Sequence, residues 1–268
     1  MEGKNLLLDI PNVKTYDELR PISRGYAEKK VNVIVTQGAT ATVIAKEATK
    51  EIPIIFIWGV ADPVQAGFVK SVAHPATNIT GVTSFVGPEI SGKHLELFKE
   101  AVPSLRRVAV LHNARGEVPG REKTLNVLRE AAIKLGLTLT EKPAKSVNDV
   151  EEAVHTLSKQ TTDGIFVLVS GLFAEPCKRI AAIATQERLP LSGCEEEKGI
   201  LLSYGPHAYR TGHRGAWYVD KLLTGTKPQD LPVEATTKFE FIINLKTAKQ
   251  IGVTIPPNVL ARADRVIK

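Results

Sequence analysis

The chain has 268 residues, enough for two lobes of ordinary size that each bury a hydrophobic core. Hydrophobic residues make up 43% and charged residues 24% of the sequence, which excludes a disordered or fibrous protein. The formal net charge is +6, but lysine and arginine form nothing longer than pairs such as Lys29-Lys30, and this scatter argues against nucleic-acid binding because phosphate recognition needs a concentrated basic face.

Short apolar runs alternate with longer segments of helical period, and this alternation predicts parallel β-sheets covered by helices. The predicted strands are residues 5–10, 31–36, 54–58, 79–83, 108–112, 137–141, 164–169, 189–192 and 200–204. The predicted helices between them are residues 16–29, 39–50, 64–73, 89–101, 122–135, 147–159 and 175–187. Asp62-Pro63 is typical of a helix start, and Gly136 is typical of the residue that follows a helix.

The order of these elements predicts two lobes. A second βα series begins after Pro103, and the expected boundary lies there. Beyond Tyr204, a long helix at 209–223, a strand-like stretch to Asn244 and a helix at 245–251 predict a tail that crosses to the first lobe and returns. The fold class is therefore α/β, with two Rossmann-like lobes joined by a hinge of several strands. The expected N-terminal lobe is residues 1–104 and about 206–230, and the C-terminal lobe is residues 105–205 and about 231–268.

Local motifs for metals, nucleotides and catalysis are absent from the sequence. Gly87 to Lys93 has the spacing of a phosphate-binding loop, but Pro88 has no N–H and His94 replaces the magnesium-binding hydroxyl, which favours a plain helix start. No G-x-G-x-x-G or G-x-S-x-G occurs, and the six histidines lack the spacing of a helical metal pair. We expect no cofactor and no metal, although distant residues could still assemble a catalytic centre.

The two cysteines, Cys177 and Cys194, lie in apolar segments, and we expect both to be buried free thiols. No run approaches the roughly 18 to 20 apolar residues of a membrane span. No charged-then-apolar leader precedes Glu2 and Lys4, so the sequence predicts a cytosolic, already processed or truncated chain.

Candidate ligand-binding residues follow the predicted strands, because open α/β sheets bind ligands at the carboxyl ends of their strands. In the first lobe, hydroxyl groups and helix amides could bind an anion such as a carboxylate. Thr40 could instead be a helix cap, the pattern favours a cap for Asp62, and Thr83 and Ser84 could close a turn. These candidates are Gly38, Ala39, Thr40, Ala41, Asp62, Thr83 and Ser84.

In the second lobe, Phe173 could stack on an organic ligand or belong to the core, and Glu195 could pair with a ligand ammonium or lie in a solvated turn. The candidates here are Asn113, Ser170, Gly171, Leu172, Phe173, Glu195 and Tyr204.

Several elements in a fixed order carry a resemblance: D-P-V-x-A-G, N-I-T-G, S-Y-G, K-P-x-D-L-P-V-E and I-N-L-K-T-A-K-x-x-G. From about Gly3 to the end, the chain resembles ABC transporter substrate-binding proteins of the TrpX-like type. The resemblance implies a type I periplasmic binding fold, no catalysis, and closure on a small solute, often an amino acid and frequently an aromatic one. It also implies a membrane permease as partner, a monomeric state, and a place in the periplasm or, as a lipoprotein, on the cell surface.

In relatives, the positions matching Gly38 to Ala41, Asp62, Thr83-Ser84 and Ser170 to Phe173 face the cleft. Relatives normally carry an export signal, a first strand and a first helix ahead of the E-G-K-N element, so a truncated start is expected here. Asn113-Ala114 also replaces the family's Asn-Pro pair, which predicts different recognition by that loop.

Two other functions compete with the receptor. An enzyme on a doubly wound fold would need a paired nucleophile and base, and substrate turnover would reveal it. The ligand-sensing core of a transcription regulator would need a helix-turn-helix segment ahead of the first lobe, and this sequence contains none.

Overall fold

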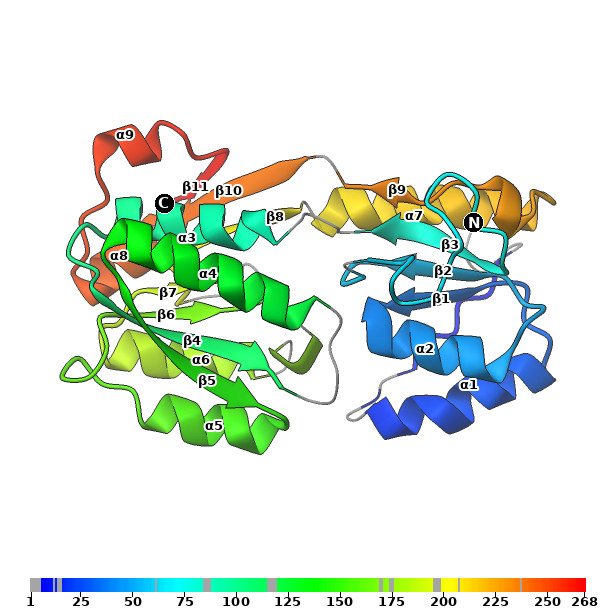
Figure 1. Cartoon of the computed structure of the whole chain (residues 1–268), viewed down its shortest axis with the longest axis horizontal. Helices are drawn as coiled ribbons and strands as arrows, with labels where there is room; N and C mark the ends of the chain where they lie inside the picture. Colours follow the sequence, from blue (N-terminus) through cyan, green and yellow to red (C-terminus); the bar gives the residue numbers. More distant parts are fainter. Residues whose placement is uncertain are drawn as a thin grey trace. The chain divides into compact units, whose positions relative to one another are not determined.

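The chain forms two compact units in a computed structural model (Figure 1). Unit 1 comprises Met1–Thr83 and Arg210–Glu234, and unit 2 comprises Ser84–Tyr209 and Ala235–Lys268, so the chain passes from one unit to the other at three points. The structure describes residues 6–11, 13, 16–60, 62–83, 88–114, 120–168, 171–173, 176–194, 199–206, 208–236 and 238–268.

Unit 1 is a sheet with helices on both faces (Figure 1). Its strands, in the spatial order β1-β2-β3-β9, are β1 (Ile34–Gln37), β2 (Ile54–Ile57), β3 (Ile79–Thr83) and β9 (Glu234–Ala235), and the first three pair in parallel. The helices are η1 (Tyr16–Glu18), α1 (Leu19–Glu28), α2 (Gly38–Ala48), α7 (Ala208–Leu223) and η3 (Pro228–Asp230). Helices α1 and α2 cover one face of the sheet, and α7 covers the other.

Unit 2 contains a larger sheet with the order β11-β10-β8-β7-β6-β4-β5, in which only β10 and β8 pair antiparallel among the described strands. The strands are β4 (Arg107–Asn113), β5 (Thr138–Ala144), β6 (Gly164–Val167), β7 (Leu191–Ser192), β8 (Leu202–Pro206), β10 (Phe239–Asn244) and β11 (Arg265–Ile267). The helices are α3 (Glu89–Ala101), α4 (Arg121–Leu135), α5 (Val147–His155), η2 (Gly171–Phe173), α6 (Cys177–Gln186), α8 (Leu245–Ile251) and α9 (Pro257–Leu260).

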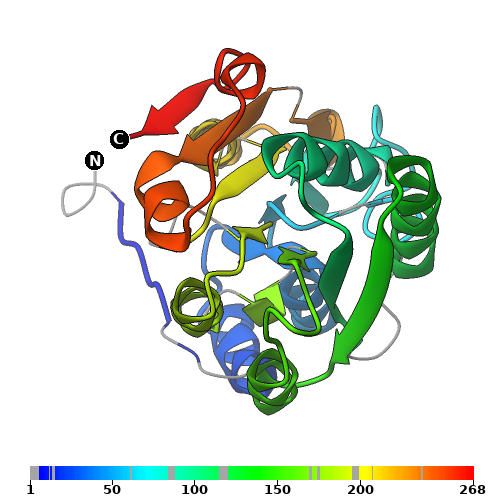
Figure 2. The same cartoon turned by 90° about the vertical axis from the view of Figure 1, so that its left-hand side faces the viewer.

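Helices α3 and α4 lie on one side of this sheet and α5 and α6 on the other (Figure 2). The centre of strand β4, residues 108–111, is continuously apolar because both of its faces are covered. Val108 and Val110 pack in the core under α3 and α4, whereas Ala109 and Leu111 pack in the core under α5 and α6. Because successive side chains point to opposite faces, the part of a strand that lies between two helical layers is apolar at successive positions. The predicted α/β class with parallel sheets is confirmed.

One helix end was predicted correctly, and another shows a cap that the sequence analysis did not name. Gly136 takes the left-handed conformation at the end of α4, with φ +65°. Ser146 caps α5, since its side chain accepts a hydrogen bond from the Asp149 N–H at 3.2 Å while Asp149 bonds back to the Ser146 N–H. Such a reciprocal pair satisfies two amides that the helix leaves unpaired.

Two predicted elements are wrong. Residues 7–10 form no strand, and Leu7 and Ile10 are 93% and 82% exposed. The predicted helix 64–73 is instead a series of turns. The Pro63 carbonyl accepts from both Phe68 and Val69, and Gly67 adopts φ +67°, a conformation that ends helical winding.

Helix α3 belongs to unit 2, whereas the boundary predicted near residue 104 places it in the first lobe. The reason is packing. Leu95, Phe98 and Ala101 of α3 are fully buried in the same core as β4 and α4, so the apolar face of the helix is satisfied by the second sheet.

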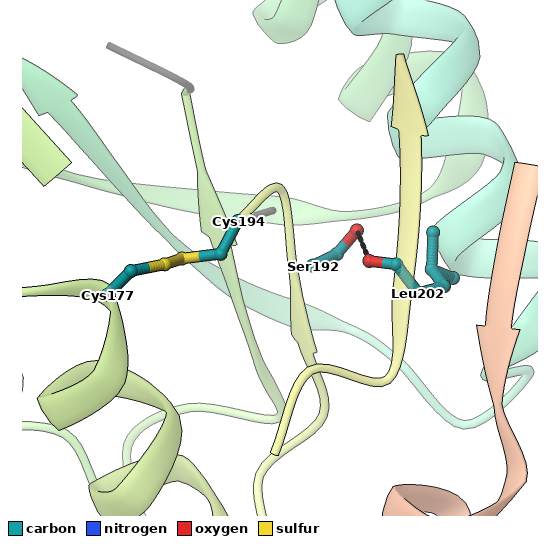
Figure 3. Close-up of a disulfide and its surroundings, with 4 residues drawn as sticks. All are labelled: Cys177, Ser192, Cys194 and Leu202. Atoms are coloured by element: carbon teal, nitrogen blue, oxygen red, sulfur yellow. Dashed lines mark hydrogen bonds between the residues drawn. A yellow bond between two sulfur atoms is a disulfide. The ribbon is translucent and has the colours of Figure 1, made fainter. Parts of the chain in front are cut away.

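Cys177 and Cys194 form a disulfide, and the prediction of two free thiols is therefore wrong (Figure 3). Cys177 is the first residue of α6 and Cys194 follows β7, with Cα atoms 6.3 Å apart. Both residues are buried, as expected from their apolar surroundings. The pairing depends on how β6, β7 and α6 pack together, which spacing along the chain does not reveal. No helix of the described part of the chain is long and apolar enough to cross a membrane.

Gly81 of β3 lies opposite Phe56 and adopts φ +149°, and a Cβ atom there would lie 2.1 Å from the Phe56 carbonyl oxygen. We expect Gly81→Ala to lower the free energy of unfolding of unit 1 by at least about 2 kcal/mol. Both tryptophans, Trp58 and Trp217, lie in unit 1, so urea unfolding followed by tryptophan fluorescence measures this change.

The matched control is Gly212→Ala in α7, where a Cβ meets nothing within 4 Å. This control should raise the free energy of unfolding by about 0.5 to 1 kcal/mol, because alanine is the better helix former. Equal stability of the two variants would contradict the packing of β3 on β2.

Candidate ligand-binding loops

The first strand-end loop of unit 1 leads directly into α2. Gly38 adopts φ +83° and donates its N–H to the Trp58 carbonyl at 2.9 Å, which fixes the start of the helix. The N-cap residue, Gln37, makes no side-chain cap hydrogen bond among the described contacts. Amides of a first helical turn carry partial positive charge. With the Gly38 N–H already bonded, the predicted Gly38 to Ala41 segment presents the Ala39 and Thr40 amides as donors suited to a carboxylate.

Of three threonines near the start of α2, Thr36 and Thr42 are buried and hydrogen-bonded, and Thr40 is exposed. Thr42 is buried, donates to the Gly38 carbonyl at 2.8 Å, and lies 2.8 Å from the Thr36 hydroxyl. Thr40 lies on the exposed side of the same turn. Because Gln37 occupies the N-cap position, Thr40 is not the cap of α2.

The other two strand-end loops of unit 1 leave the same edge of the sheet, since β1, β2 and β3 run parallel in neighbouring positions. The Asp62 Oδ1 atom accepts from the Val64 and Gln65 amides at 3.0 and 2.9 Å, so this carboxylate caps a turn. Thr83 is buried and its hydroxyl donates to the Val60 carbonyl. Both side chains therefore have structural partners at the position where ligand contacts were predicted. Ser84 lies outside the described residues.

In unit 2, Asn113 ends β4 and is half-buried. Its carbonyl accepts from the Arg121 Nη1 atom at 3.4 Å. The preceding residue, His112, is buried with its Nε2 atom 3.8 Å from Glu141 Oε2, and burial lowers the pKa of His112 despite the opposing effect of Glu141. The Arg129 guanidinium donates two hydrogen bonds of 2.8 and 3.0 Å to the Glu141 carboxylate, so the negative charge of Glu141 is already paired with a positive one.

The two side chains described in η2, after β6, are buried. Leu172 and Phe173 are 6% and 3% exposed and pack in the core under α5 and α6. This position agrees with the interpretation of Phe173 as a core residue and gives no support to stacking on a ligand. Gly171 begins η2, and Ser170 and Glu195 lie outside the described residues.

Tyr204 is separate from the strand-end loops, because it lies in the middle of β8. Its ring packs against the rings of His94 on α3, Phe239 and Phe241, with centroids 6.1, 5.7 and 6.3 Å away. The side chain therefore contributes to an aromatic layer between α3 and the sheet. Tyr204 also lines a cavity together with Phe239 and Phe241, away from the strand-end loops, so the ligand contact predicted for it stays a prediction.

His94 is a buried polar residue that was not among the predicted site residues. It is buried in α3, and its Nε2 atom lies 2.7 Å from the Ser192 hydroxyl, which also donates to the Leu202 carbonyl at 3.2 Å (Figure 3 shows the second bond). Burial lowers the pKa of His94 to about 3. The sequence signal for a buried histidine was its place among the apolar residues Leu95, Leu97 and Phe98 of the same helix. Within the described ranges, no group of three or more His, Cys, Asp or Glu side chains could hold a metal ion.

Known proteins resemble this chain over nearly its full length. A family model described as ABC transporter substrate binding protein matches residues 1–267. The tyrosine-binding protein of Clostridioides difficile (strain R20291) is 26% identical over 254 residues, which cover 93% of this chain and 72% of the relative.

Two solved structures are also similar. A conserved domain protein from Vibrio cholerae is 31% identical with a TM-score of 0.85, over 99% of this chain and 88% of that one. An ABC domain in complex with L-Trp from Streptococcus pneumoniae is 24% identical with a TM-score of 0.82, over 94% of this chain and 84% of that one.

The buried His94 predicts a pH dependence of stability. Its pKa is about 3 in the folded protein and about 6.5 in an unfolded chain, so between these values the unfolded state binds more protons. The free energy of unfolding should therefore fall as the pH drops below 6.5, by up to about 1.4 kcal/mol per pH unit from this residue.

His94→Gln keeps a polar group near the Ser192 hydroxyl but does not titrate. Urea unfolding followed by circular dichroism at pH 7.0, 6.0 and 5.0 should show a smaller loss of stability in this variant than in the unchanged protein. Equal losses in the two proteins would mean that His94 is not held neutral in the core.

Proposed function

Because the chain belongs to the ABC transporter substrate-binding protein family and has the type I periplasmic binding protein fold, we propose that it is the receptor of an ABC importer for an aromatic amino acid. The observation that carries this proposal is the family match over residues 1–267. The relative that is named a tyrosine-binding protein supports the ligand class. The family consists of binding proteins rather than enzymes, and we extend this to the present chain as a receptor without catalysis.

The geometry of unit 1 suits one end of an amino acid. In the proposal, the ligand carboxylate accepts from the first-turn amides of α2 and from the exposed Thr40 hydroxyl. Asp62, at the neighbouring strand end, brings a carboxylate to the same edge, where a ligand ammonium would be attracted. Complementary charges fix the orientation of such a ligand, and apolar contacts supply the remaining affinity.

The proposed mechanism is hinge closure. A ligand that contacts strand-end loops of both units stabilises the closed state through contacts that an open state does not make. The three passages of the chain between the units, at residues 83–84, 209–210 and 234–235, would form the hinge. The closed shape would then be recognised by a membrane permease.

The disulfide supports a place outside the cytoplasm. Disulfides form and persist in oxidising compartments and are rare in the reducing cytosol. We therefore propose that the protein acts in the periplasm or at the cell surface, as a monomer, without a nucleic-acid partner.

A ligand panel tests the function directly. We expect the thermal unfolding midpoint to rise with the concentration of L-tyrosine or L-tryptophan, because a ligand that binds only the native state stabilises it, by about 2.7 kcal/mol at a hundred times the dissociation constant. L-Alanine, L-lysine and D-glucose are the controls. A rise with D-glucose alone would reject the amino-acid assignment, and chemical conversion of the bound solute would reject the receptor.

Thr40→Ala tests the α2 end of the site. Loss of one hydrogen bond to a charged carboxylate should weaken binding of the stabilising amino acid about tenfold or more in isothermal titration calorimetry. Val43→Ala is the matched control, because Val43 is also exposed on α2 but lies one turn beyond the helix start. The affinity of this variant for the amino acid should not change. Equal affinity in both variants would contradict a carboxylate at this helix end.

A further inference from the structure

The Cys177–Cys194 disulfide joins two strand-end loops of unit 2. Strands β6 and β7 are parallel neighbours, with Ile165 opposite Leu191 and Phe166 opposite Ser192, so the segments that follow them leave the same edge of the sheet. The segment after β6 leads through η2 to Cys177, and the segment after β7 reaches Cys194 two residues beyond the strand. We propose that this disulfide is a positioning element of the ligand site, which holds the two loops of unit 2 in the geometry that binds the solute.

At one end of the disulfide, Cys177 belongs to a helix that packs in the core of unit 2. Cys177 begins α6, whose residues Ile180 and Ala181 are 1% exposed in the core. Leu172 and Phe173 of η2 pack in the same core. The loop after β6 is therefore attached to the helix and to the sheet by apolar contacts on both sides of Cys177.

The other end is held just as closely. Gly193 adopts φ +99°, and a Cβ atom there would lie 2.0 Å from the Val167 carbonyl oxygen, so this loop presses against the end of β6. Ser192 is fixed by its bonds with His94 and Leu202. Further along, a Cβ at Gly199 would lie 2.7 Å from the Ala181 carbonyl oxygen of α6. Both described ends of the loop after β7 thus rest on α6, one of them through the covalent bond.

Most of the core on this face of unit 2 is made of residues other than the two cysteines. Ala109, Leu111, Val150, Ile165 and Leu191 are buried there and pack through apolar contacts. Unit 2 should therefore remain folded when both cysteines are replaced. What the bond adds is a restriction on the loops at the sheet edge, and loops restricted before binding lose less conformational entropy when a ligand orders them.

This inference rests on the proposed function for its ligand, and L-tyrosine and L-tryptophan are the probes. The double variant Cys177→Ser with Cys194→Ser should bind the probe that stabilises the unchanged protein about three- to tenfold more weakly in isothermal titration calorimetry. Amide hydrogen exchange should increase in peptides that contain η2 and residues 193–194, and should stay the same in β4.

Leu128→Ala is the matched control, because Leu128 is fully buried in unit 2 on the opposite face of the sheet, under α3 and α4. It should lower stability by an amount comparable to the loss of the disulfide while leaving probe affinity unchanged. A loss of affinity in Leu128→Ala as large as in the double variant would overturn the inference, since general destabilisation would then explain both.

The remaining outcomes are also decisive. Unchanged affinity in a folded double variant overturns the positioning role. If the unchanged protein binds neither probe, the proposed ligand class fails, and hydrogen exchange alone then decides the inference. Faster hydrogen exchange in the double variant, confined to the loops after β6 and β7, supports the proposal that the disulfide restrains them. Unchanged exchange overturns the proposal.

Discussion

Parallel strand pairing is the constraint from which the candidate site follows. In unit 1, β1, β2 and β3 are joined residue by residue, so Gln37, Ile57 and Val82 stand side by side across the sheet. Because the three strands run in the same direction, they end at the same edge of the sheet, and the segment that follows each strand begins there. Parallel neighbours cannot be joined by a tight hairpin, so each of these segments is a longer connection. Segments far apart in sequence are thereby brought together without any direct interaction between their side chains.

Polar side chains at these strand ends are hydrogen-bonded to the backbone of the turns around them. Thr83 and Asp62 stand at strand ends, yet one hydroxyl donates to a backbone carbonyl and one carboxylate oxygen accepts from two backbone amides. Buried or half-buried polar atoms must be satisfied, and turns are the nearest source of partners. Thr40 is different, because α2 turns it toward solvent while Thr36 and Thr42 satisfy each other beneath it.

Unit 2 adds covalent and buried polar contacts around the end of β7. The disulfide, the His94–Ser192 contact and the close approach of Gly193 to Val167 all fall within three consecutive residues of the chain, 192 to 194. Such a concentration of restraints just after a two-residue strand fixes a loop that hydrogen bonds of the sheet alone would hold weakly. It also explains why His94, a polar residue within the apolar face of α3, is accommodated in a dense core.

The sequence by itself determined the α/β class, the order of most strands and helices and the family, because strand burial on two faces and helical burial on one impose different apolar periods along the chain. It also located the segments at strand ends. Tertiary structure decided the rest. The Cys177–Cys194 pairing, the position of Phe173 in the core, the assignment of α3 to unit 2 and the replacement of a predicted helix after Pro63 by turns all depend on which surfaces meet in space. Local periodicity records that a side chain is buried, but it does not record the partner against which that side chain packs.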